Sequence, residues 1–191
     1  TYKVYIYIIF MVKIGIFGLW HLGSVLAAAW SKLGNKVVGF DYDSIVINNL
    51  KNAKPPVFEP FLSDTIEKGL NKGLLEFSND IMDLDDCDFV FITYDTPVDD
   101  ADESDTSILT KAINDLKTIL KKNAIVIVSS QSPVGFCSEL RKILIDQDSS
   151  LDLAYSPENL RLGEALKCYL EPDRIILGTA NRETRKACME L

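Results

Sequence analysis

The sequence IGIFGLWHLGS occupies residues 14–24, and a helical pattern follows it before VVGFD at residues 37–41. The apolar start is typical of a buried parallel strand. Gly18 and Gly23 stand at the first and third glycine positions of G-x-G-x-x-G, and Asp41 follows about 20 residues later. In such a βαβ unit the helix N-terminus points its N–H groups at a pyrophosphate. The sequence therefore predicts a dinucleotide site, with NAD as the cofactor.

Each position of this unit has a physical role. Gly18 allows the tight turn, and Gly23 lets the helix pack closely against the sheet. Asp41 accepts hydrogen bonds from the adenosine ribose and repels a 2′-phosphate, which favours NAD over NADP. Trp20 occupies the middle glycine position. Either its ring points outward and leaves backbone N–H groups to the phosphates, or the cofactor lies differently here. His21 either donates to a phosphate oxygen or faces solvent.

Composition narrows the class of protein. The 191 residues, 47% of them hydrophobic, suit one domain, or one domain and part of another. A net charge of −8 without a basic stripe argues against a nucleic-acid partner. The four cysteines form no C-x-x-C pair, so we expect no disulfide framework and no metal site, and reduced thiols in the cytoplasm.

The N-terminal apolar run at residues 4–12 is too short to span a bilayer and lacks a small-residue cleavage site. We therefore expect no membrane partner. Met11 directly precedes the first strand, so residues 1–10 are interpreted as an extension, and residues 11–191 as the NAD-binding domain.

Apolar strands alternate with helical patterns along the rest of the chain. Strands are predicted at residues 12–17, 37–41, 74–77, 87–93, 124–128, 151–154 and 174–177, and helices after Gly23 and at 43–50, 61–68, 106–120 and 136–145. This alternation predicts an α/β, Rossmann-like, doubly wound and mostly parallel sheet with helices on both faces. Polar loops at residues 18–23, 94–97, 129–133 and 156–161 should then meet at one edge.

Five ordered motifs, at residues 18–23, 56–60, 95–97, 129–135 and 156–163, resemble G-x-G-Y-V-G, P-x-x-E-P, N-T-P, K-S-T-V-P-V-G and N-P-E-F-L-R-E-G. Pro172-Asp173-Arg174 follows them. In this order they resemble the NAD-binding domain of the UDP-glucose/GDP-mannose dehydrogenase family, from Met11 to about Gly178.

The resemblance implies an oxidoreductase that oxidises C6 of a UDP- or GDP-sugar to the uronic acid, with two hydride transfers to NAD. The implied cofactor-binding residues are Gly18, Leu19, Trp20, His21, Leu22, Gly23, Asp41, Tyr94, Asp95, Thr96, Ser130 and Gln131. Those implied for the sugar nucleotide are Glu158, Asn159, Leu160 and Arg161.

The implied catalytic residues are Glu158 and Gln131. Glu158 is placed to position water or take a proton; the alternative is that it caps a short helix after Pro157. Gln131 replaces a usual Thr, and Leu162 replaces a second Glu in many members. A leucine cannot move a proton, so these differences either mark a sub-branch or alter the activity.

Oxidation through a thioester needs a thiolate nucleophile. In the family, that cysteine lies in the part of the enzyme formed by the central helical domain and the C-terminal substrate domain. Those domains follow the NAD-binding domain, and we expect them to be absent from this chain, which stops at Leu191. We expect the chain alone to be inactive, and a homodimer only if the missing central helix is present. Two alternatives stay open: a β-hydroxyacid-type dehydrogenase domain, and a non-catalytic dinucleotide-binding or oligomerising module.

Overall fold

A computed structural model describes residues 12–98, 104–146, 150–158 and 160–191. Within these residues, seven strands form one sheet in the order β3-β2-β1-β4-β5-β6-β7. Neighbouring strands are parallel except β6 and β7. The strands are β1 (Lys13–Phe17), β2 (Lys36–Phe40), β3 (Leu75–Ser78), β4 (Phe89–Ile92), β5 (Ile125–Val128), β6 (Asp152–Tyr155) and β7 (Gly178–Thr179). The predicted doubly wound α/β fold is confirmed.

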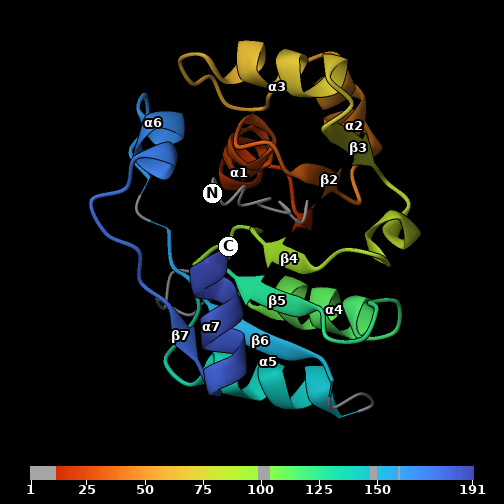
Figure 1. Cartoon of the computed structure of the whole chain (residues 1–191), viewed down its shortest axis with the longest axis vertical. Helices are drawn as coiled ribbons and strands as arrows, with labels where there is room; N and C mark the ends of the chain where they lie inside the picture. The colour runs from red at the N-terminus through yellow and green to blue at the C-terminus, as the bar shows by residue number, and fades with distance from the viewer. Residues whose placement is uncertain (1–11, 99–103, 147–149, 159) are drawn as a thin grey trace, which may run out of the picture.

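Helices cover both faces of this sheet (Figure 1). One face carries α1 (His21–Lys32), α2 (Ser44–Lys51), α3 (Leu62–Asn71), α6 (Ala165–Leu170) and α7 (Arg182–Glu190). The other carries α4 (Ser107–Leu116), α5 (Phe136–Ile145) and the short 3-10 helix η1 (Ile81–Leu84). In Figure 1, α1 lies between the sheet and α3, while α4 and α5 lie together on the opposite side.

The strands are held in place because their side chains alternate between two buried clusters. In β1, Ile14 and Ile16 face α1, whereas Phe17 belongs to the cluster on the other face. Every residue of β4 and β5 is buried, as expected for central parallel strands. This double packing fixes the carboxyl ends of the strands, and with them the loops that follow.

Several predicted boundaries are wrong. The last strand is Gly178–Thr179, not residues 174–177, because Ile175 and Ile176 are exposed and the edge strand pairs at only two positions. The helix predicted at 106–120 ends at Leu116. The short helices η1 and α6 and the polar helix α7 were not predicted.

The predicted extension at residues 1–10 lies outside the described residues. Among the described ones, no helix combines the length and the apolar character needed to cross a membrane.

Candidate functional site

The strand order reverses between β1 and β4. In open parallel sheets, ligands bind outside the carboxyl ends of the strands at such a reversal. All four predicted polar loops reach one cavity there, of about 190 Å³. It is lined by His21, Leu22, Tyr94, Asp95, Thr96, Pro97, Ser129, Ser130, Gln131 and Glu158. The predicted meeting of the loops is therefore observed.

The turn after β1 requires glycine at two positions. Gly18 has a φ of 102°, which side chains rarely allow. A Cβ on Gly23 would stand 1.8 Å from the carbonyl oxygen of Gly18, so only glycine lets α1 begin this close to the strand. Trp20 precedes α1 without making a side-chain capping hydrogen bond. The first N–H groups of the helix have no partner within it, and they suit an anion.

The side chain at the middle glycine position does not fill the cavity. Trp20 is 49% exposed and is not among the lining residues. This favours the explanation in which its ring points outward. His21, by contrast, lines the cavity, and its Nε2 lies 2.8 Å from Oε1 of Glu59. Neither explanation considered for His21 included this contact.

Asp41 follows β2 and is buried among hydrogen-bond donors. Its Oδ2 accepts the N–H of Leu19 at 2.7 Å, and its Oδ1 accepts the N–H of Asp43 at 3.0 Å. The hydroxyl of Tyr94 also donates to Oδ1, at 3.3 Å. Because a carboxylate offers about four lone-pair sites, these three bonds leave one for a ribose hydroxyl. Asp41 thus fixes the glycine turn and can still accept from a ligand.

Tyr94 closes the side of the site next to Gly18. Its ring packs edge-on against Phe17 and is stacked with Tyr42, the two centroids being 6.2 Å apart. Burial, reinforced by the Asp41 carboxylate, raises the pKa of Tyr94 well above its usual range. The phenol is therefore a neutral donor that stays on Asp41.

The loops after β4 and β5 are joined directly. The hydroxyl of Thr96 donates to the carbonyl oxygen of Gln131 at 2.8 Å. Ser130 is buried, and its hydroxyl donates to the carbonyl oxygen of Ile92 at 3.3 Å. Both hydroxyls keep lone pairs that can accept, and the exposed Gln131 side chain is free to reach a ligand.

Glu158 follows β6 and also lines the cavity. Partial burial raises the pKa of Glu158, helped by the Asp95 carboxylate and opposed by the Leu160 N–H and by His21. The first helix after Pro157 begins only at Ala165, so the helix-capping alternative for Glu158 is wrong. Asn159 lies outside the described residues. Arg161 is exposed and lines neither this cavity nor its larger neighbour.

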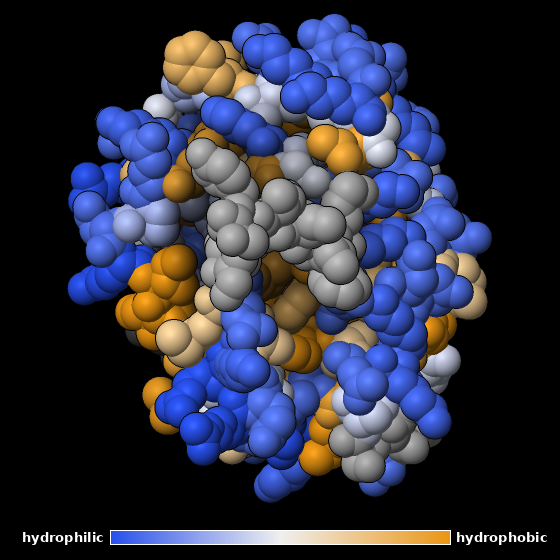
Figure 2. Space-filling view, viewed as in Figure 1, coloured by the Kyte–Doolittle hydropathy of each residue, from blue (hydrophilic) through white to orange (hydrophobic). Residues whose placement is uncertain are grey.

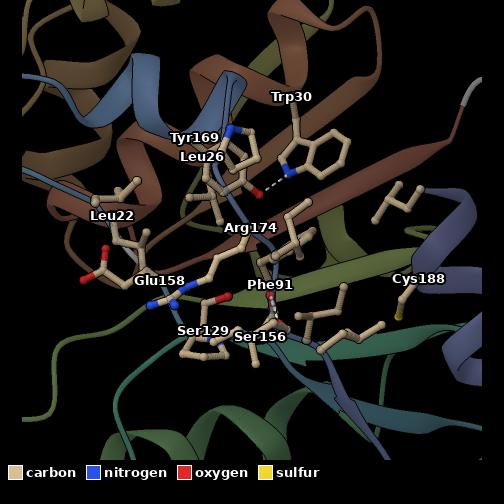
Figure 3. A pocket seen from close by; sticks show the side chains of 18 of the residues that line it. Leu22, Leu26, Trp30, Phe91, Ser129, Ser156, Glu158, Tyr169, Arg174 and Cys188 are labelled. Atoms are coloured by element: carbon tan, nitrogen blue, oxygen red, sulfur yellow. Dashed lines mark hydrogen bonds between the residues drawn. The ribbon is translucent and has the colours of Figure 1, made fainter.

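That larger neighbouring cavity, of about 700 Å³, runs along α1 over β4 and β5 toward α7. Its lining is mostly apolar and includes Leu26, Trp30, Phe91 and Ile127. Figure 2 shows apolar side chains at the surface of this face between mostly hydrophilic areas. In Figure 3 the Arg174 side chain reaches into the cavity beside Glu158, a placement that the sequence alone did not predict.

The described residues include no group of three or more His, Cys, Asp or Glu side chains placed to hold a metal ion.

Comparison with known proteins decides the family. Residues 12–191 match the model of the UDP-glucose/GDP-mannose dehydrogenase family, NAD binding domain. The chain belongs to this family. The UDP-glucose 6-dehydrogenase of Rickettsia typhi is 30% identical over 87% of the chain, and UDP-glucose 6-dehydrogenase TuaD of Bacillus subtilis is 30% identical over 95%. This match favours the UDP-glucose/GDP-mannose dehydrogenase family over the β-hydroxyacid-type alternative.

Solved structures of the UDP-glucose/GDP-mannose dehydrogenase family agree. A ternary complex of GDP-mannose dehydrogenase from Pseudomonas aeruginosa superposes with a TM-score of 0.87 at 26% identity, covering 93% of this chain and 43% of that one. The chain spans only 39% and 40% of the length of the two relatives above. It corresponds to the family's NAD-binding N-terminal domain, and the glycine turn, the uncapped start of α1 and the free lone pair of Asp41 fit NAD.

Proposed function

We propose that the chain is the NAD-binding part of an enzyme that oxidises C6 of a UDP- or GDP-sugar to the uronic acid, with two hydride transfers. One observation carries this: the glycine turn and the loops after β4, β5 and β6 meet at a single cavity. Bound NAD supplies the hydride acceptor. Membership of the family supports the reaction, which we assign to a polypeptide longer than this chain.

The chain's own residues divide the work along the cofactor. Backbone N–H groups at the start of α1, in residues 21–23, hold the pyrophosphate, and Asp41 accepts from the ribose of the adenosine half. Tyr94 and Asp95 line this half of the site. Thr96, Ser130 and Gln131 lie at the nicotinamide end, where lone pairs and the Gln131 amide can orient a carboxamide.

Glu158 is the residue we assign to the chemistry. Its raised pKa brings the carboxyl closer to neutral pH, where it exchanges protons more readily and can hold the attacking water. The exposed Leu162 cannot share this task. We therefore assign proton handling in both oxidation steps to Glu158, and contact with the sugar nucleotide to residues 158–161, with Arg174 a further cation beside them.

For the longer polypeptide we also propose a cytoplasmic location and a homodimer built on the absent central helix. The spacing of the four cysteines, which form no C-x-x-C pair, supports the cytoplasmic part of this proposal.

The test is a titration of the chain with NAD and, in parallel, with NADP, followed by tryptophan fluorescence because Trp20 lies in the phosphate turn. We expect saturable NAD binding and weaker NADP binding. Asp41→Asn should weaken NAD binding by about tenfold, because a hydrogen bond to a charged acceptor is lost. Asp64→Asn, on the exposed face of α3, is the control for charge. A folded chain that binds neither dinucleotide would contradict the proposal and favour a module without this function.

A further inference from the structure

A second buried carboxylate lies behind the cavity. The side chain of Glu59 has 0% of its surface exposed. Its Oε1 accepts the N–H of Gly163 at 3.0 Å and faces Nε2 of His21 at 2.8 Å, and its Oε2 accepts the N–H of Ala165 at 3.1 Å. Along the chain, His21, Gly163 and Ala165 lie 38, 104 and 106 residues from Glu59. Glu59 therefore joins segments that the sequence separates widely.

The two segments that Glu59 joins belong to the two halves of the proposed site. His21 is the first residue of α1, directly after the phosphate turn, and it lines the small cavity. Gly163 lies in the turn that carries the chain from Glu158 into α6, and Ala165 is the first residue of that helix. Glu59 itself lies in the loop before α3, directly before Pro60. One side chain thus sets the position of the cofactor loop relative to the Glu158 loop.

Glu59 performs this role as an anion. Burial alone would raise its pKa, but the N–H of Gly163, His21 and the N–H of Ala165 outweigh burial and lower it. A buried carboxylate is costly unless donors satisfy it, and here three do. Moving either loop away would leave a desolvated charge with fewer donors. The two loops are thereby linked in energy as well as in space.

We propose that Glu59 is a positioning residue that couples the dinucleotide loop, through His21, to the loop that carries Glu158. The part of this proposal that involves NAD rests on the proposed function. A dinucleotide that restricts the motion of the start of α1 also restricts His21. Through its hydrogen bonds, Glu59 then restricts the motion of residues 163–165. Glu59 touches neither cofactor nor substrate, so it acts only through these two loops.

The first experiment measures amide hydrogen exchange at Gly163 and Ala165, with and without saturating NAD. In the natural chain NAD should slow exchange at both amides. In Glu59→Gln, which keeps the shape but loses the charge, we expect NAD affinity to fall by about tenfold and NAD to leave both amides unchanged. Glu67→Gln, on the exposed face of α3, should behave like the natural chain. Unaltered affinity, or NAD protection that survives Glu59→Gln, overturns the proposal.

A second arm needs no NAD, and so separates failure of this inference from failure of the proposed function. His21→Leu should speed exchange at Gly163 and Ala165 by about tenfold in the natural background. His21→Gln, whose amide can still donate to Glu59, should restore most of the protection. If the exchange rates of the Gly163 and Ala165 amides are the same in His21→Leu as in the natural chain, the coupling is overturned, even if NAD binds as expected. If Glu59→Gln does not fold, the His21 pair alone decides.

Discussion

Gly23 is where the phosphate turn and the first helix come closest. A methyl group there would meet the backbone oxygen of Gly18 at 1.8 Å and Oγ1 of Thr93 at 2.7 Å. Backbone cannot rotate away as a flexible side chain can, so Gly23→Ala must push α1 off the turn. We expect a loss of about 3 kcal/mol in the free energy of unfolding, measured by urea denaturation, and loss of NAD binding.

Gly178 is the matched control glycine. A Cβ there would have its nearest contact at 3.7 Å, an ordinary van der Waals distance. Gly178→Ala should keep the free energy of unfolding within about 0.5 kcal/mol of the natural chain and should bind NAD normally. Equal effects from the two substitutions would contradict the packing argument for Gly23.

The ionisation of Glu59 makes a pH prediction. Because its pKa is lower in the folded chain than the ordinary 4.5, the unfolded chain binds the proton at higher pH. The stability that this carboxylate contributes is therefore complete above pH 4.5 and is lost as the pH falls through the folded pKa. In urea unfolding from pH 7 to pH 3, the difference between the natural chain and Glu59→Gln should shrink toward acid. A difference that is constant with pH would show that the carboxylate is not ionised in the fold.

At the residue scale, the sequence predicted what is local. Gly18, Gly23 and Asp41 lie within one βαβ unit, so spacing alone places them together. The role of Glu59 could not be predicted, because its donors arrive from distant positions only after the sheet has formed. The bond from Tyr94 to Asp41 is hidden for the same reason.

At the scale of elements, a buried carboxylate helps to attach α7 to the sheet, in addition to the partly buried Ala187, Cys188 and Leu191 that pack against the apolar cluster. Asp152 in β6 is buried, and its carboxylate accepts from Nε of Arg141 in α5 at 2.5 Å. It also accepts from Asn181, at the start of α7, and from the buried Thr184. One carboxylate therefore fastens two helices to the end of the sheet.

Asp152→Asn should release α7. Replacing the charge leaves Arg141 without its partner and sets an NH2 group against other donors, so we expect a loss of roughly 2–3 kcal/mol in the free energy of unfolding. Amides of α7 should exchange faster than those of α1. Glu190→Gln breaks only the exposed pair with Lys186 in the same helix, and should change stability by less than about 0.5 kcal/mol. Unchanged exchange in α7 after Asp152→Asn would argue against this attachment.

The same contacts explain which elements the sequence did not reveal. In α7 only Thr184 is buried and most positions are polar, so the weak apolar spacing of Ala187, Cys188 and Leu191 did not reveal the helix, although Asn181 is a typical N-cap. The apolar run Ile175-Ile176 imitates a strand yet lies exposed beside the larger cavity. By contrast, β4 and β5 are buried on both faces, and their continuous apolar runs were correctly predicted as strands.

At the scale of the whole molecule, the described residues provide a cofactor edge and little else of an active site. The smaller cavity contains donors, acceptors and Glu158, but no cysteine. The larger cavity beside it is lined mainly by apolar side chains over β4 and β5, with Cys188 and Met189 of α7 among them. The chain spans 39% of the length of the Rickettsia typhi relative.

The thiols of this chain are poor candidates for the missing nucleophile. Burial raises the pKa of Cys87 to about 12 and that of Cys188 to about 11, and it also raises the pKa of Cys137. A thioester forms from a thiolate, and at neutral pH these three groups hold their protons. Cys168 lies in the larger cavity rather than at the edge that holds Glu158 and Gln131.

We therefore expect the chain to bind NAD without turning over a sugar nucleotide. Mixed with NAD and either UDP-glucose or GDP-mannose at neutral pH, it should form no NADH above the buffer blank, measured by absorbance. A full-length relative such as the Bacillus subtilis enzyme, assayed with UDP-glucose in the same buffer, is the positive control. NADH that rises in proportion to the chain and disappears in Glu158→Gln would show that these residues already contain a complete catalytic site. The absence of turnover, together with saturable NAD binding, would place the remaining chemistry on residues beyond this domain.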